Sequence, residues 1–159
     1  MDTPAIRVER LTKQYGDVVA VKDISFKIRS GTIAAILGGN GAGKTTTLAM
    51  LLGLLLPTNG KIDILGQDML KFRYRVLSRM NFGSPYVDLP KRLTVRENLM
   101  VFSALYGVKN PKKRIQDLAY TLALANFINQ PVGQLSSGQR TRVALAKALI
   151  NKPSLLLLD

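Results

Sequence analysis

The feature that most constrains the fold of this chain is a glycine-rich segment at residues 38–45. Its sequence, Gly-Gly-Asn-Gly-Ala-Gly-Lys-Thr, fits the pattern G-x-x-x-x-G-K-[ST] of phosphate-binding loops. An unbroken apolar run, TIAAIL, precedes it at residues 32–37, and a helical pattern follows at residues 44–56, where Pro57 stops it. An apolar run of this kind is typical of a strand buried on both faces of a parallel sheet. The segment therefore predicts a strand–loop–helix unit of an α/β fold.

The residue types of this loop suit a bound phosphate. Glycines allow several backbone N–H groups to approach one phosphate, since side chains would block that approach. The helix that begins near Lys44 adds the positive end of its dipole, and Lys44 itself supplies a cation to the terminal phosphates. The Thr45 hydroxyl is placed to ligate Mg²⁺. A glycine-rich turn that binds nothing would need neither Lys44 nor Thr45. We expect nucleotide phosphates to contact Gly38, Asn40, Gly41, Ala42, Gly43, Lys44, Thr45 and Thr46.

The rest of the chain alternates strand and helix patterns. An opening strand carries Ile6 and Val8, then Leu11 after a slip in the alternation, and a turn at Tyr15, Gly16 and Asp17 leads into a second strand. The other predicted strands lie at residues 19–28, 61–65, 80–82 and 155–158, and helices are predicted at residues 94–106, 111–125 and 137–150. The last strand, four leucines, is expected to be buried.

Composition removes several classes of function. The chain of 159 residues contains no cysteine and no histidine, which excludes disulfides, thiolate zinc sites and Ser-His or Cys-His nucleophile pairs. The longest apolar run, at residues 48–56, is too short for a membrane span, which needs about 20 residues. Residue 2 is an aspartate and no signal sequence follows, so we expect a cytoplasmic protein.

The net charge of +13 suits an anionic partner. Eleven basic residues lie between Lys71 and Arg114, against two acidic residues, Asp88 and Glu97. This basic segment forms either a solvated face or a surface for an anionic partner such as a nucleotide, a nucleic acid or a membrane surface.

Two further segments carry candidate site residues. Asp159 follows the four leucines at the end of the last strand, where a carboxylate can hold Mg²⁺ beside a phosphate-binding loop. The run Leu135-Ser136-Ser137-Gly138-Gln139 stands at the start of a predicted helix and exposes free N–H groups to an anion. Taken alone, this run is better explained as an ordinary helix cap.

Together these segments resemble the nucleotide-binding subunits of ABC (ATP-binding cassette) transporters. GGNGAGKTT matches their Walker A loop, with Gly39 where proline is usual, and LLLLD matches their Walker B strand. LSSGQ matches their LSGGQ signature, with Ser137 where glycine is usual. Tyr15 stands at the aromatic position that stacks on adenine; the alternative is a turn aromatic that covers the core. LTVRENL at residues 93–99 and ALYG at residues 104–107 resemble the helical insert of the exporter-type, ABC-2-like branch.

The resemblance implies a P-loop NTPase fold with a RecA-like core, an N-terminal antiparallel β subdomain and a helical insert, incomplete at its C-terminus. It divides the chain into residues 1–80 (β subdomain and loop core), 84–140 (helical subdomain) and 141–159 (return helix and Walker B strand). It implies ATP and Mg²⁺ as cofactors, with Thr45 and Asp159 at the metal. It also implies a head-to-tail homodimer, in which Ser136, Ser137, Gly138 and Gln139 of one copy close over the ATP of the other. A separate membrane permease would couple ATP hydrolysis to export, and the protein would lie on the inner face of the cell membrane.

Two departures from the family pattern bear on catalysis. The family places a glutamine where this chain has Ser84 or Pro85, and neither side chain supplies an amide. The family's general-base glutamate, dimer-contacting loop and switch histidine follow the position of Asp159, so we expect no catalytic residue within this chain. The strand that follows Walker B in the family also pairs with both neighbouring strands, so we expect residues 32–37 and 155–158 to face unpaired backbone.

Two other functions remain open on sequence alone. A soluble ABC-type ATPase acting on ribosomes or nucleic acid would use the basic segment as its binding face, although such proteins carry two cassettes or long coiled arms. A non-functional remnant of a transporter subunit is the third reading.

Overall fold

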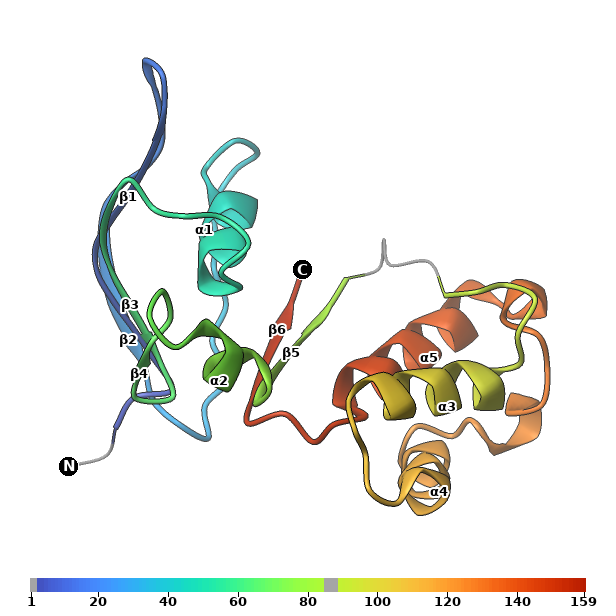
Figure 1. Ribbon diagram of the computed structural model, residues 1–159. Coiled ribbons are helices and arrows are strands. Elements are labelled where there is room, and N and C mark those ends of the chain that lie inside the picture. Colours follow the sequence, from blue (N-terminus) through green and yellow to red (C-terminus); the bar gives the residue numbers. More distant parts are fainter. Residues whose placement is uncertain (1–2, 85–88) are drawn as a thin grey trace. The chain divides into compact units, whose positions relative to one another are not determined.

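The computed structural model describes residues 3–84 and 89–159 (Figure 1). The chain divides into two compact units, residues 1–77 and residues 78–159, each of which is described here by itself. The first unit holds an antiparallel sheet and the glycine-rich loop. The second holds a helical core and two parallel strands.

The first unit is built on a four-stranded sheet. Its strands, in the order β2-β1-β3-β4, are β1 (Ile6–Tyr15), β2 (Val18–Ile28), β3 (Asn59–Ile64) and β4 (Gln67–Asp68), and all neighbours are antiparallel. The predicted opening hairpin is confirmed: Tyr15 pairs with Val18 across a turn in which Gly16 has φ +54°. The antiparallel N-terminal sheet predicted for this part of the chain is therefore present.

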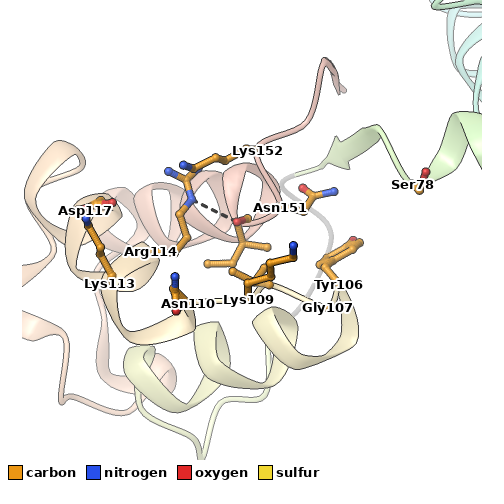
Figure 2. A pocket seen from close by; sticks show the side chains of 12 residues that line it. Ser78, Tyr106, Gly107, Lys109, Asn110, Lys113, Arg114, Asp117, Asn151 and Lys152 are labelled. Carbon is orange, nitrogen blue, oxygen red and sulfur yellow. Dashed lines mark hydrogen bonds between the residues drawn. The ribbon is translucent and has the colours of Figure 1, made fainter.

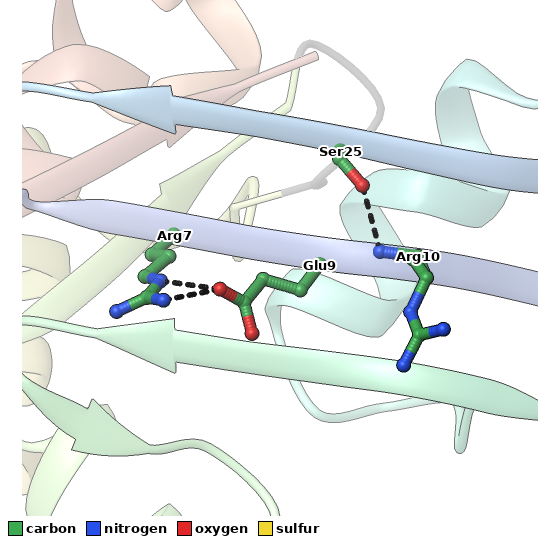
Figure 3. Close-up of polar contacts among 4 residues, drawn as sticks. All are labelled: Arg7, Glu9, Arg10 and Ser25. Atoms are coloured by element: carbon green, nitrogen blue, oxygen red, sulfur yellow. Dashed lines mark hydrogen bonds and ion pairs between the residues drawn. The ribbon is translucent and has the colours of Figure 1, made fainter.

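The slip in the first strand is a β-bulge. The ladder between β1 and β2 shifts register between Val8 and Leu11, and Arg10 has φ +46°. The Arg10 N–H donates to Ser25 Oγ at 2.8 Å, so a side chain replaces the lost ladder bond (Figure 3). The bulge returns Leu11 to the buried face with Ile6 and Val8, as the sequence pattern requires.

The helix that follows the glycine-rich loop is shorter than predicted. Helix α1 spans Lys44–Leu51, not residues 44–56, and it ends six residues before Pro57. Gly53 has φ +64°, and its N–H donates to Met50 O at 3.0 Å. A glycine in the left-handed region just past the last turn is the usual C-terminal stop of a helix, so Gly53 ends α1 before Pro57 can.

The predicted strand at residues 32–37 is wrong. These residues form neither strand nor helix and are exposed, with Ile33 and Leu37 at 104% and 89% relative exposure. A strand exists only where a neighbour completes its hydrogen-bond ladder, and no described residue pairs with this segment. The predicted burial is therefore also wrong, whereas the lack of a pairing strand agrees with the expectation that residues 32–37 face unpaired backbone. A short helix that the sequence did not predict, α2 (Arg73–Leu77), closes this unit.

The second unit is a helical core beside two parallel strands. Helices α3 (Val95–Leu105), α4 (Pro111–Thr121) and α5 (Ser137–Leu149) surround one hydrophobic cluster, and short 3₁₀ turns lie at Ala125–Phe127 and Val132–Gln134. Strand β5 (Met80–Gly83) pairs in parallel with β6 (Leu155–Leu158). Each helix presents its apolar face to the cluster, whose members include Val95, Leu99, Ile115, Leu118, Val143 and Ala146.

Two details of this unit differ from the sequence prediction. Helix α4 ends at Thr121, not near residue 125, and Ala123 follows it with φ +51°. The last strand is only partly buried: Leu157 is buried, whereas Leu158 is 59% exposed. Strand β6 has one described neighbour, β5, so no described strand pairs with its second edge, in agreement with the expectation of unpaired backbone at residues 155–158.

Candidate nucleotide-binding site

The glycine-rich loop is seated on β2. Gly41 and Gly43 both have φ +81°, a backbone conformation that glycine adopts without steric cost. A Cβ on Gly43 would lie 2.4 Å from the carbonyl oxygen of Ala20 and 3.0 Å from Cγ2 of Val21, so only glycine allows this approach. A Cβ on Gly41 would meet nothing within 4 Å. One glycine therefore fixes the loop to the sheet, and the other gives the loop its curvature.

Lys44 folds back across the loop. Its Nζ donates to the carbonyl oxygens of Gly38 and Gly39 at 2.8 and 2.7 Å. These bonds use two of the three donors of an ammonium group and place the cation over the loop. An anion that enters the loop meets this charge first.

The helix after the loop begins without a side-chain cap. Gly43 is the N-cap of α1, and the first N–H groups of a helix have no partner within it. The backbone N–H groups of Lys44, Thr45 and Thr46 lie in this first turn. They stand at the positive end of the helix dipole and suit an anionic ligand.

The three threonines of this turn have different roles. Thr47 is buried, and its Oγ1 donates to the Gly43 carbonyl oxygen at 2.9 Å. Thr45 is exposed and Thr46 is half-buried. Sequence reasoning missed Thr47, which lies outside the loop pattern and ties the first turn of α1 to the glycine. The Thr45 hydroxyl remains at the surface, as a cation ligand requires.

Tyr15 lies on the same unit as the loop, at the end of β1. The ring is 50% exposed, and Lys13 Nζ lies 4.9 Å from the ring centroid. Tyr15 pairs with Val18 on β2. Ala20, whose carbonyl oxygen lies against Gly43 of the loop, follows Val18 by two residues, a distance of about 7 Å along the strand. A core-covering aromatic would be buried, so this exposure favours a ring available to a ligand.

The run at residues 135–139 caps α5. Ser136 is the N-cap: its N–H donates to Gln139 Oε1 at 2.8 Å, and the Gln139 N–H donates to Ser136 Oγ at 3.2 Å. The helix-cap reading is therefore confirmed for these two side chains. Ser137 and Gly138 are exposed, and a Cβ on Gly138 would meet nothing within 4 Å. Nothing that the structure describes in this chain requires glycine at position 138.

Asp159 extends the ladder of the two parallel strands. Its N–H donates to the Gly83 carbonyl oxygen at 3.1 Å, and its side chain is exposed. This contact brings Asp159 to the end of β5, next to Ser84, the first of the two positions where a glutamine was expected. The second, Pro85, lies outside the described residues. A Cβ on Gly83 would lie 2.9 Å from Leu158 Cδ2, the end of an exposed side chain that can move aside.

The candidate residues thus form two groups. Tyr15 and the loop residues from Gly38 to Thr46 belong to the first unit. Ser136 to Gln139 and Asp159 belong to the second unit, so the joint role of Thr45 and Asp159 at one metal ion stays a prediction. Within residues 3–84 and 89–159, no helix combines the length and the apolar character needed to cross a membrane.

A glycine-rich loop that ends in Lys and Thr at the start of a helix defines the class of P-loop nucleotide-binding proteins. The sequence profile of the ABC transporter family matches residues 21–159, and the chain belongs to this family. The predicted fold class is confirmed by solved structures. The chain is similar to cbiO1 from Clostridium perfringens, part of an ABC transporter complex, with a TM-score of 0.87 and 28% identity over 100% of this chain and 66% of that one. It is also similar to another ATP-binding subunit of an ABC transporter, with a TM-score of 0.80 and 25% identity over 99% of this chain and 66% of that one.

Curated relatives are ATP-binding proteins of transport systems. The chain is 37% identical to the Nod factor export ATP-binding protein I of Ralstonia nicotianae, over 99% of this chain and 50% of the relative. It is 38% identical to the bacitracin transport ATP-binding protein BcrA of Bacillus licheniformis, over 97% of this chain and 50% of the relative. It is 42% identical to the ABC transporter ATP-binding protein NatA of Bacillus subtilis, over 89% and 59%. The chain spans about half the length of these relatives. Their names favour transport over the ribosome or nucleic-acid alternative.

Proposed function

We propose that this chain is the ATP-binding part of an export-type ABC transporter and binds Mg-ATP at residues 38–46. The observation that carries the proposal is the seat of the glycine-rich loop on β2, with Lys44 held across it and the uncapped first turn of α1 behind it. This arrangement offers one cation and several backbone donors to a chain of phosphates. The half-exposed ring of Tyr15, on the same sheet, is available to stack on the base.

The residues present fit a magnesium ion. Mg²⁺ prefers oxygen ligands, and the exposed Thr45 hydroxyl of the first unit and the exposed Asp159 carboxylate of the second unit are each a ligand of this kind. When bound, the ion neutralises charge on the β- and γ-phosphates. Thr45 would hold it from the first turn of α1, and Asp159 from the end of β6.

The signature run is proposed to meet the nucleotide of a second copy in a head-to-tail pair. Gly138 supports this role, because glycine in a helix costs about 1 kcal/mol relative to alanine and no described neighbour in this chain needs it. A missing side chain at an exposed first turn leaves the backbone N–H groups open to close approach by an anion. The relatives' association with transporters supports a separate permease and a place on the inner face of the membrane.

Residues 1–159 are proposed to bind ATP without supplying the base that activates water. The sequence has no histidine and two glutamates. Glu9 is engaged by Arg7 (Figure 3), and Glu97 accepts hydrogen bonds from the N–H and hydroxyl of Thr94. Asp159 is the carboxylate proposed for the metal. A polypeptide limited to these residues should show no steady phosphate release, and its exposed apolar segment at residues 32–37 should favour aggregation. Steady release and a cooperative melt from that polypeptide would contradict both expectations.

The basic segment is proposed to lie beside the surface that meets the membrane subunit. Its charge suits an anionic partner, but one of its members has a structural role: Arg114 donates to the carbonyl oxygens of Leu149 and Ile150 at the end of α5. Charge reversal at Lys112 and Lys113 should therefore reduce association with the membrane partner without changing ATP affinity. If the variant co-sediments with the membrane partner as the wild type does, these lysines belong to a solvated face and not to the contact surface.

The binding of ATP is tested on the protein at its full natural length. Lys44→Ala should leave the circular dichroism spectrum unchanged and abolish tight ATP binding measured by calorimetry. Lys27→Ala, which removes the same charge from an exposed position on β2 of the same unit, is the matched control and should bind ATP as the wild type does. Equal affinity in the Lys44→Ala variant and the control would refute the proposed site.

A further inference from the structure

A basic cavity lies in the second unit, where α4 begins and α5 ends. It has a volume of about 430 Å³, and its lining includes the side chains of Lys109, Lys113 and Lys152 together with the amides of Asn110 and Asn151 (Figure 2). This volume is within the range of small-ligand sites, about 300–1,000 Å³. The lining is cationic and polar, unlike the apolar lining of an ordinary void.

The charge of the cavity is not balanced within the part of the chain that the structure describes. Asp117 is the one acidic residue among those that line it. None of Lys109, Lys113 and Lys152 makes an ion pair with a described residue. Three lysines therefore line one concave site with a single carboxylate among them, and an anion bound there would offset their excess positive charge.

The carbonyl groups at the C-terminal end of α5 do not explain why these three lysines line the cavity. Helix carbonyl ends attract cations, but Arg114 already serves this end: its Nε donates to Ile150 O at 3.2 Å (Figure 2), and its Nη2 donates to Leu149 O. The start of α4 adds further positive character instead. Its N-cap, Asn110, makes no side-chain capping bond, and Pro111 follows it with no acid in the first turn.

The wall of the cavity is held in place by strand β5. The Tyr106 hydroxyl donates to Asn81 Oδ1 at 3.2 Å, and Asn81 Nδ2 donates to Asn151 Oδ1 at 3.0 Å. Asn81 is buried, so these bonds are shielded from water. Lys152 has φ +50°, an unfavourable conformation for a lysine, and it lines the cavity directly after Asn151. These bonds fix the position of Asn151, the residue directly before Lys152.

We propose that this cavity binds a compact phosphate-bearing anion, at a site separate from the glycine-rich loop. A tetrahedral phosphate presents several oxygens and more than one negative charge, which matches a cavity lined by three lysines and two amides better than a single carboxylate does. The phosphate belongs either to a free solute or to a lipid headgroup. The two sites lie in different units, so they can be tested independently.

The test uses the protein at its full natural length with Lys44→Ala introduced, so that the loop does not take up the probe. Inorganic pyrophosphate is titrated by calorimetry at constant ionic strength. Lys113→Ala should weaken binding at least about tenfold, and Lys109→Ala and Lys152→Ala should each weaken it too. Lys112→Ala is the matched control: Lys112 is the neighbour of Lys113 on α4 but does not line this cavity, and its removal should change affinity by less than about twofold.

The second arm identifies the source of the phosphate. Vesicles of phosphatidylglycerol replace pyrophosphate, with phosphatidylcholine vesicles as the uncharged reference. Lys113-dependent binding of vesicles without binding of pyrophosphate assigns the cavity to a lipid headgroup, and the reverse assigns it to a free solute. If the Lys112 and Lys113 variants lose affinity equally, or if neither probe binds, the cavity holds only solvated lysines and the proposal is overturned.

Discussion

Substitution of Gly43 by alanine isolates the contact that seats the nucleotide loop on the sheet. The backbone at Gly43 has φ +81°, and an L-residue in this region costs about 1–2 kcal/mol. The added Cβ would also lie 2.4 Å from the Ala20 carbonyl oxygen, a backbone atom that cannot rotate away. Overpacking of this kind costs about 1–3 kcal/mol. The two terms predict that Gly43→Ala lowers the free energy of unfolding by about 2–5 kcal/mol.

Gly41→Ala provides the control for the backbone term alone. Gly41 has the same φ of +81°, but a Cβ at this position would meet nothing within 4 Å. We expect the substitution to cost only about 1–2 kcal/mol. Urea unfolding of the full-length protein, followed by circular dichroism, measures both values, and ATP calorimetry then reports whether the displaced loop still binds. If Gly43→Ala is no more destabilising than Gly41→Ala, the contact with β2 does not constrain the loop and the reasoning fails.

Three further predictions concern single side chains. Arg114→Ala should lower the free energy of unfolding by about 1–3 kcal/mol, because two carbonyl oxygens at the end of α5 lose their donor, whereas Lys112→Ala should be neutral in the same urea titration. Hydrogen bonds from Thr94 hold the pKa of Glu97 below its usual 4.5, so the stabilisation is complete above pH 4.5 and is lost as the pH falls through the lower folded-state value. Glu97→Gln should therefore flatten the acid side of the stability profile, and an unchanged profile would show that the cap does not contribute. Tyr15→Ala should weaken the binding of ATP about tenfold or more while leaving the binding of inorganic triphosphate nearly unchanged. If both affinities fall together, Tyr15 has a structural role and does not stack on the base.

Features set by near neighbours in the sequence were predictable. The hairpin turn at Gly16, the bulge before Leu11 and the start of α5 at Ser136 all depend on residues a few positions apart. The glycine-rich loop was equally predictable, because a turn that binds no phosphate would need neither Lys44 nor Thr45 after its glycines. The sequence therefore indicated the turn–helix position of the candidate loop on the first unit, and its role in nucleotide binding stays a prediction.

Features set by distant partners were not predictable. Residues 32–37 have the pattern of a buried strand, but a ladder depends on a neighbour that the pattern does not specify. Arg114 was read as part of a charged surface because nothing local shows that its guanidinium reaches carbonyls more than thirty positions later. Thr47 likewise looked like one more hydroxyl of the helix, although it bonds the glycine carbonyl from a buried position.

The two capping boxes of the second unit have the same geometry but opposite electrostatic outcomes. Helix α3 is capped by Thr94 with a glutamate, Glu97, so a carboxylate cancels much of the roughly half unit of positive charge at its first turn. Helix α5 is capped by Ser136 with a glutamine, Gln139, which makes the same two hydrogen bonds without charge, and no acid stands in its first turn. A neutral amide also does not titrate. The positive end of the α5 dipole is therefore not offset by a carboxylate at any pH at which the fold survives, whereas that of α3 is offset while Glu97 is ionised.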